Sequence, residues 1–215
     1  MRSHPPLPAG AKPWLHDFAL WLGKFIYISA YRVRIRGRER IPATGPVVLV
    51  ANHTSFVEPQ ILFGMQRRRA VFLVKSEMAR GPLKVLLPWL GQLFIRRGTP
   101  DRGPLMAAVE FLRAGGLIGV FPEGGRGIGD VSYAEQGAAW LVRSSDAVVV
   151  PVAVRGTDRP KGSGWRFRPV VDVWIGQPFT VTVARGRSGL TTATEQIRVG
   201  LADLVRELDD FRGQG

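Results

Sequence analysis

Short apolar runs rich in valine, each followed by a segment with helical periodicity, constrain the fold of this chain more than any other feature. A strand that is buried on both faces of a parallel sheet reads as a continuous apolar run. Such runs alternating with helices predict an α/β fold, in which helices flank a largely parallel central sheet. The expected strands lie at residues 47–51, 70–76, 93–97, 117–121, 147–156 and 168–176.

The helical segments are set by apolar periodicity and by glycine and proline breaks. With 215 residues, 45% of them hydrophobic, the chain is large enough for one core, so we expect a single domain over residues 1–215, with residues 1–13 flexible. Helices are expected at residues 14–31, 56–65, 82–88, 102–114, 134–145 and 190–212. The apolar stripe of the last helix consists of Ile197, Leu201, Leu204, Leu208 and Phe211.

The composition excludes several kinds of site. The chain has no cysteine, which removes disulfides, thiolate metal ligands and a cysteine nucleophile. Its three histidines are His4, His16 and His53, so a histidine-rich metal site is not available. The formal net charge of +13 favours a polyanionic partner, which could be nucleic acid, an anionic lipid surface or a phosphorylated small molecule.

The apolar segment at residues 14–31 has two interpretations. It opens with aromatic residues and leads to Arg32, Arg34 and Arg36, which predicts an amphipathic helix in a membrane interface with its basic flank toward lipid headgroups. The alternative is a helix packed on the domain, with a strand beginning at Tyr31. No uninterrupted apolar run reaches the ~18 residues of a spanning helix, and the proline-rich start lacks the pattern of a cleavable signal peptide.

Polar residues follow three of the expected strands directly. Asn52 and His53 follow the first strand, Arg96 and Arg97 end the run from residue 93, and the glycine-rich stretch 122–127 follows the next strand. In open α/β sheets, ligands bind at the carboxyl ends of the strands. We therefore expect these three groups to surround one site.

His53 and Glu58 are candidates for general-base chemistry. Imidazole is the side chain best suited to take a proton near neutral pH, and a nearby carboxylate can orient it and stabilise the imidazolium. The turn between the two residues could bring their side chains together. However, Ser55 to Glu58 also fits the S-x-x-E capping box, in which Glu58 only reaches back to the Ser55 N–H. The residues alone leave both interpretations open.

Cations and glycines at the other strand ends could hold an anion. Paired guanidinium groups such as Arg96 and Arg97 bind phosphate in a forked geometry, and Lys75 is a cation at another strand end. In the glycine-rich stretch, backbone N–H groups can crowd an anion that Arg126 caps, whereas Glu123 suits substrate hydroxyls. Each feature could also be a solvated basic edge or a plain turn.

The chain resembles the lysophospholipid acyltransferase family, of the bacterial 1-acylglycerol-3-phosphate acyltransferase type, over about residues 35–180. NHTSFVE resembles the first family motif, GQLFIRRG the second, VFPEGGRG the third and VVVPVAVRGTDR the fourth, in the family's order. The resemblance implies that His53 and Glu58 are catalytic. It also implies that Arg97 binds the substrate phosphate.

Further roles are implied by the other motifs. Glu123, Gly124 and Arg126 would help to bind the glycerol phosphate, and Lys75 fits a basic position of the family. Pro151 would lie near the acyl donor.

This sequence departs from the family pattern at four positions. Glu58 stands where the family usually has Asp, so one extra methylene must be absorbed in the pair. Gly125 and Gly127 stand where hydroxyl residues are usual, which removes polar contacts to the acceptor. Arg96 replaces an acidic or other polar residue and favours an anionic acceptor.

The resemblance implies acyl transfer from a thioester, acyl-CoA or acyl carrier protein, to the hydroxyl of lysophosphatidic acid or a related lysolipid. His53 would remove the hydroxyl proton, Glu58 would orient His53, and Asn52 or loop N–H groups would support the oxyanion. We expect no acyl-enzyme, because the chain has no cysteine and no G-x-S-x-G elbow. No metal or bound cofactor is expected. The expected location is an anionic lipid surface, the cytoplasmic face of the inner membrane.

Three other functions stay open at this stage. A thioesterase on the same scaffold would release fatty acid without an acceptor. A nucleic-acid-binding domain would use the positive charge, but its aromatic residues would be interleaved with Lys and Arg, whereas here they lie in apolar helical segments. A lipid-binding protein with a decayed catalytic pair is the third.

Overall fold

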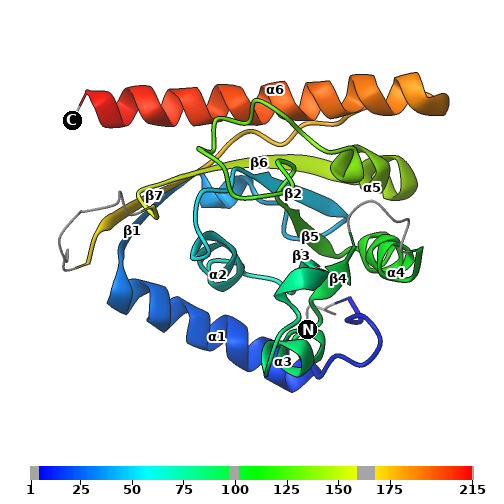
Figure 1. The fold of residues 1–215 in the computed structure, drawn as a ribbon, viewed down its shortest axis with the longest axis horizontal. Helices are drawn as coiled ribbons and strands as arrows, with labels where there is room; N and C mark the ends of the chain where they lie inside the picture. Colours follow the sequence, from blue (N-terminus) through cyan, green and yellow to red (C-terminus); the bar gives the residue numbers. More distant parts are fainter. Residues whose placement is uncertain (1–4, 97–101, 159–167, 215) are drawn as a thin grey trace.

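The computed structural model describes residues 5–96, 102–158 and 168–214, and within them seven strands form one sheet (Figure 1). Their spatial order is β1-β7-β6-β2-β5-β3-β4. The strands from β6 to β4 are parallel, β7 is antiparallel to β6, and β1 is parallel to β7, so the predicted largely parallel sheet is confirmed. The bounds are β1 Arg32–Arg36, β2 Val47–Ala51, β3 Ala70–Lys75, β4 Leu93–Ile95, β5 Leu117–Val120, β6 Val148–Arg155 and β7 Val170–Ile175.

Helices cover both faces of this sheet (Figure 1). One layer consists of α4 (Arg102–Arg113), α5 (Gly137–Ser145) and α6 (Gly186–Gly213). On the other face lie α1 (Pro13–Ala30), α2 (Glu58–Gly64) and α3 (Leu83–Trp89). Single 3₁₀ turns occur at Arg38–Arg40 and Ser76–Met78. Helices therefore flank the sheet as the alternation of runs predicts.

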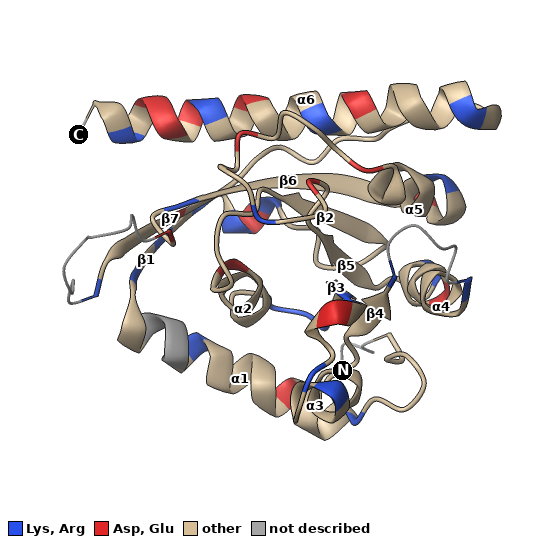
Figure 2. Cartoon of the chain, in the orientation of Figure 1, with Lys and Arg blue, Asp and Glu red and all other residues tan. Residues whose placement is uncertain are grey.

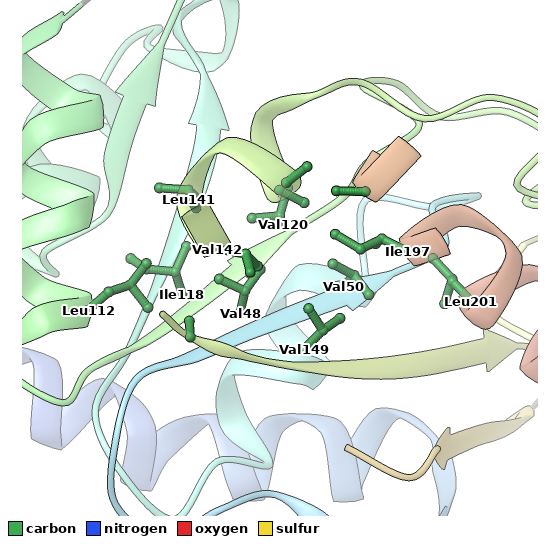
Figure 3. Packing of buried hydrophobic residues seen from close by; sticks show 14 of the residues in the cluster. Val48, Val50, Leu112, Ile118, Val120, Leu141, Val142, Val149, Ile197 and Leu201 are labelled. Atoms are coloured by element: carbon green, nitrogen blue, oxygen red, sulfur yellow. The ribbon is translucent and has the colours of Figure 1, made fainter. Parts of the chain in front are cut away.

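The strand β2 shows why a continuous apolar run forms the centre of the sheet. Each of its residues, 47–51, is fully buried. Side chains alternate between the faces of a strand, so Leu49 packs on the α2 side while Val48 and Val50 face the α4–α5–α6 layer. Full burial of a Val or Leu side chain contributes about 1.5–3 kcal/mol. In the α4–α5–α6 layer, the partners of Val48 and Val50 include Leu112, Leu141, Ile197 and Leu201 (Figure 3).

The parallel strands bring five chain segments to one edge of the sheet. Because β2, β3, β4, β5 and β6 all run in the same direction, their last residues lie at the same edge. These last residues are Ala51, Lys75, Ile95, Val120 and Arg155. The polar stretches that follow them in the sequence leave the sheet on that side.

The helix α1 packs on the domain. At its contact with α2, a Cβ added to Gly23 would lie 3.0 Å from the Cα of Gly64, so the two helix backbones approach closely. The strand that the alternative interpretation begins at Tyr31 is present as β1. None of the helices in the described part of the chain is long and apolar enough to span the bilayer.

Two of the arginines that follow α1 contact protein groups. Arg34 donates to the buried carboxylate of Asp172 at 2.6 Å, and the Arg36 guanidinium lies 4.5 Å from the centre of the Trp174 ring. The Arg34 side chain is still 59% exposed, so these contacts do not test the prediction that the basic flank is directed at lipid headgroups.

Several segments differ from the predicted boundaries, among them α5, which begins at Gly137 rather than at residue 134. Residues 5–12 belong to the segment predicted to be flexible, and at its end the Lys12 N–H donates to the carbonyl of Trp89 in α3 at 2.8 Å. The helix α2 begins at Glu58 rather than at residue 56, and α6 begins at Gly186 rather than at residue 190. On α6, Phe211 is 41% exposed although the rest of its stripe is buried.

Candidate active site

His53 and Glu58 form a direct pair just beyond the carboxyl end of β2. The Nδ1 atom of His53 lies 2.8 Å from Oε2 of Glu58. The Glu58 side chain is fully buried, whereas 15% of the His53 side chain is exposed. An ionised carboxylate can only accept hydrogen bonds, so Nδ1 carries the proton in this pair. The other ring nitrogen, Nε2, then has the lone pair that can take a proton from a substrate.

Several donors hold the Glu58 carboxylate. Oε2 accepts from the Thr54 N–H at 2.9 Å, while Oε1 accepts from the hydroxyls of Thr54 at 2.5 Å and Thr157 at 2.7 Å. Burial raises the pKa of Glu58, but the hydrogen bonds from His53, Thr54, Thr157 and the Ser55 backbone outweigh it, so the pKa lies below its ordinary value. Glu58 is therefore an anion that its donors stabilise inside the fold.

The predicted capping box forms only in part. The structure describes every residue of α2. The N-cap residue of this helix is Val57, and no side chain donates or accepts a capping hydrogen bond there. The Ser55 hydroxyl instead accepts from the Val57 N–H at 3.3 Å. The Ser55 backbone still supports the carboxylate of Glu58. Glu58 therefore binds His53 and backbone donors together, and the two interpretations of the sequence are compatible.

The glycine-rich loop after β5 is docked onto the main chain of His53. The His53 N–H donates to Oε1 of Glu123 at 2.8 Å, and the Gly127 N–H donates to the His53 carbonyl at 3.0 Å. The Phe121 ring centre lies 4.3 Å from that of the imidazole. Gly124 has φ of 64°, a left-handed conformation that favours glycine. Burial raises the pKa of Glu123, although the hydrogen bond from His53 opposes this.

Two of the predicted phosphate-binding cations, Lys75 and Arg126, lie in segments at this edge of the sheet. The Arg126 guanidinium lies 3.5 Å from the centre of the Phe56 ring, which joins the loop to the turn before α2. Lys75 is the last residue of β3, and Arg96, which is exposed, follows β4. Arg97 lies outside the described residues.

Asn52 and Pro151 have contacts within the sheet. Asn52 is fully buried; its Nδ2 donates to the Val154 carbonyl at 3.0 Å, and its Oδ1 accepts from the Val154 N–H at 2.7 Å. These contacts continue the pairing of β2 with β6, and support of the oxyanion by Asn52 stays a prediction. Pro151 is buried beside Val50 within β6, and its carbonyl accepts from the Gly176 N–H at 2.9 Å. Its predicted place near the acyl donor stays a prediction.

The pair and the loop lie inside a region that matches a known family. The acyltransferase family model matches residues 32–155, which is more than half of the chain. This chain belongs to the acyltransferase family. The matched residues include His53, Glu58 and the whole glycine-rich loop, so the pair and the loop that contacts it both lie in the part of the chain that matches the family.

Curated acyltransferases are similar to this chain over most or part of its length. A 1-acyl-sn-glycerol-3-phosphate acyltransferase of Bacillus subtilis is 23% identical over 190 residues, which are 83% of this chain and 91% of that protein. One from Borreliella burgdorferi is 25% identical over 137 residues, 62% of this chain and 55% of that protein. The alpha form from Mus musculus is 30% identical over 133 residues, 60% of this chain and 47% of that protein. The chain thus spans about half the length of several curated relatives that it matches.

A solved acyltransferase has a similar fold. The crystal structure of the 1-acyl-sn-glycerophosphate (LPA) acyltransferase PlsC from Thermotoga maritima aligns with a TM-score of 0.68 at 25% identity. The alignment covers 90% of this chain and 79% of that chain. The similarity therefore extends well beyond the four short motifs.

Sequence reasoning missed two residues of this acyltransferase site, Thr54 and Thr157. The hydroxyl group of each residue donates a hydrogen bond to Oε1 of Glu58. Thr54 stands inside the first motif, where its position between the two members of the pair is a usable signal. Thr157 follows β6, and the sequence does not show that β6 lies next to β2.

Proposed function

We propose that this acyltransferase transfers a fatty acyl group from acyl-CoA or acyl carrier protein to the free hydroxyl of lysophosphatidic acid or a related lysolipid, giving a phosphatidic-acid-type product. The observation that carries the proposal is the 2.8 Å contact between Nδ1 of His53 and Oε2 of Glu58. The names of the similar proteins support the choice of substrates.

The reaction follows from the state of the pair. Nε2 of His53 takes the proton of the acceptor hydroxyl while the hydroxyl oxygen attacks the thioester carbonyl. The buried Glu58 carboxylate stabilises the imidazolium that forms. When the tetrahedral adduct collapses, the C–S bond breaks and the imidazolium returns the proton to the thiolate. Such general-base catalysis supplies roughly 10²–10⁴-fold in rate. The proposed reaction uses no metal or bound cofactor.

The acceptor phosphate is assigned to the cations at the carboxyl edge. Lys75, Arg97 and Arg126 are the proposed phosphate ligands, because a phosphomonoester needs several cations or N–H donors to leave water. Glu123 and Gly124 are assigned to the glycerol moiety. Arg126 is supported by its position over Phe56, which lies in the turn that leads to Glu58.

We also propose that the enzyme is peripheral on the cytoplasmic face of the inner membrane, where its lipid acceptor resides. The outward side of α1 has a stripe of exposed residues that are 37–67% accessible: Trp14, Phe18, Trp21, Leu22 and Phe25. Exposed apolar residues of α3 lie on the same face of the sheet: Leu83, Val85, Leu86 and Trp89. Most of the described ribbon of α1 is tan in Figure 2, which marks residues other than Lys, Arg, Asp and Glu. Aromatic and aliphatic residues on one side of a helix suit the headgroup boundary of a bilayer, and the net charge of +13 favours anionic lipid.

The proposed function is tested by thiol release from acyl-CoA, with and without lysophosphatidic acid, for the wild type and His53→Ala. We expect release that requires the acceptor and is lost in the variant. Acceptor-independent release would instead identify a thioesterase. Release that survives His53→Ala would remove the base from the mechanism.

A further inference from the structure

The loop after β5, residues 121–136, is held on its outer side by an arginine at the end of β6. Nε and Nη2 of Arg155 donate to the carboxylate of Asp209 in α6 at 2.6 and 2.8 Å. The remaining terminal nitrogen, Nη1, donates to the Gly129 carbonyl at 3.1 Å. The ion pair with Asp209 raises the pKa of Arg155 above its ordinary value. A forked ion pair fixes the orientation of a guanidinium, so it also fixes where Nη1 points.

A second arginine repeats this arrangement two residues further along the loop. Nε and Nη2 of Arg198 donate to the carboxylate of Glu195 at 2.8 and 2.7 Å, and both residues belong to α6. Its Nη1 donates to the Val131 carbonyl at 2.9 Å. In Figure 1 the loop passes directly beneath α6. Two carboxylates of α6 therefore orient two guanidinium groups toward alternate carbonyls of the same loop.

The two carbonyls belong to residues with positive φ, a conformation that is ordinary for glycine but costly for valine. Gly129 has φ of 70°, and a Cβ there would lie 2.5 Å from Cγ2 of Thr54 and 2.8 Å from Nη1 of Arg155, so no side chain fits. Val131 has φ of 56° and is fully buried. Left-handed conformations are costly for a β-branched residue and persist only where the surroundings impose them. The bonds from Arg155 and Arg198 are part of what imposes them here.

We infer that α6, acting through Arg155 and Arg198, fixes the loop conformation that binds the acceptor. The inference rests on the proposed function, because it is that function which assigns Glu123, Gly124 and Arg126 to the acceptor. The inner side of the loop is bonded to His53, and its outer side is bonded to these two arginines. Arg155 and Arg198 are thus positioning residues for acceptor binding, and α6 lies outside the family-matched residues 32–155.

Loosening the outer side should affect acceptor binding more than chemistry. The His53–Glu58 pair has its own donors in Thr54 and Thr157, which do not depend on α6. A loop that samples other conformations offers its binding conformation for only part of the time, and the apparent affinity falls by that fraction. KM for the acceptor should therefore rise while kcat changes little.

The chain offers a matched pair of variants, Arg198→Met and Arg206→Met. Both arginines lie on α6 and both pair with an acidic residue three positions earlier, but Arg206 pairs with Asp203 and its side chain is 75% exposed. Each variant removes one surface ion pair, and only Arg198→Met removes a donor from the loop. Deuterium exchange of the peptide covering residues 121–136 measures the loop without requiring activity, and steady-state kinetics with lysophosphatidic acid measure its consequence.

We expect Arg198→Met to speed exchange in this peptide and to raise the acceptor KM about tenfold, the size of one net hydrogen bond, with kcat within about twofold of the wild type. Arg206→Met should change neither. Asp209→Asn, which leaves Arg155 in place but removes its carboxylate, should shift exchange and KM in the same direction. Equal exchange in Arg198→Met and Arg206→Met would overturn the inference. Faster exchange in a protein without turnover would support the role of α6 and count against the proposed function.

Discussion

The hydroxyl of Thr157 donates a hydrogen bond of 2.7 Å to Oε1 of Glu58, although the two residues are 99 positions apart. Thr157 follows β6, while Glu58 begins α2 after the strand β2. The bond forms because β2 and β6 are parallel neighbours, so their carboxyl ends lie side by side. The carboxylate that supports the proposed base is therefore tied to a second strand of the sheet.

Replacement of Thr157 by Val should weaken both the fold and the reaction. The change keeps the shape but removes a hydroxyl donor to a buried carboxylate, which should lower the free energy of unfolding by about 1.5–3 kcal/mol. The lost donor should also raise the pKa of Glu58. Because Glu58 must be ionised to support His53, the acid-side loss of kcat should begin at a higher pH than in the wild type. Thermal unfolding and a pH–rate profile measure the two effects.

Thr157→Ser is the matched control, since it retains the hydroxyl and removes only a methyl group. It should keep the wild-type acid limb. The folded pKa of Glu58 is lowered, so the ionised carboxylate contributes stability above the ordinary carboxyl pKa, and this contribution is lost as pH falls through the folded pKa. Thr157→Ser should keep this pH dependence of stability, whereas Thr157→Val should weaken it. An unchanged acid limb in Thr157→Val would show that this hydroxyl does not act on Glu58.

Glu58→Gln should lower kcat by about 10²–10⁴-fold, because an amide cannot supply the negative charge that stabilises the imidazolium. Its NH₂ group would also face donors from Thr54 or Thr157, so some loss of stability is expected. Glu77→Gln, at an exposed glutamate of the 3₁₀ turn after β3, is the control and should behave as the wild type. Retained turnover in Glu58→Gln would restrict Glu58 to a structural role.

Much of the fold could be predicted because the need to bury an apolar run depends on the residues of that run and not on its neighbours in space. Val47 to Ala51 must be buried whatever their partners are, so the strand is evident from its own residues. The proximity of His53 and Glu58 could be proposed for a similar reason, since only one turn separates them. Local sequence therefore offered the pair as one of two interpretations, and the alternation of strands with helices predicted a largely parallel sheet.

Contacts that depend on strand order could not be predicted. The bond from Thr157 to Glu58 requires β6 beside β2, and the bond from Arg198 to Val131 requires α6 above the loop. The same holds for Asn52, whose amide is bonded to the main chain of Val154 across the sheet. A side chain at a strand end looks alike in the sequence whether it binds substrate or a neighbouring strand.

Glu123→Gln should stabilise the protein at neutral pH while weakening acceptor binding. Burial raises the pKa of Glu123, so its ionised form is disfavoured in the fold. A raised folded pKa contributes stability at low pH that is lost as pH rises through it. Gln keeps the oxygen that accepts from the His53 N–H, so the variant should melt at a higher temperature at pH 7. The difference should vanish as pH falls below the ordinary carboxyl pKa, and equal melting at both pH values would contradict this account.

The stripe on α1 should be needed for binding to lipid and not for the chemical step. Trp21 and Phe25 are 54% and 52% exposed, and transfer of such side chains into the headgroup boundary is worth about 1.5–3 kcal/mol each. The double variant Trp21→Ser, Phe25→Ser should therefore lose at least about tenfold in partition to vesicles of phosphatidylglycerol and phosphatidylcholine, measured by sedimentation. Val199→Ser, a 39%-exposed residue on α6 at the opposite face, is the control and should bind as the wild type does. Turnover of a short-chain, water-soluble lysophosphatidic acid should be unchanged in the double variant, because the helix is proposed to bring the enzyme to lipid and not to touch the reacting atoms. Equal vesicle binding by the double variant and the wild type would remove α1 from the membrane contact and leave the surface charge as its cause.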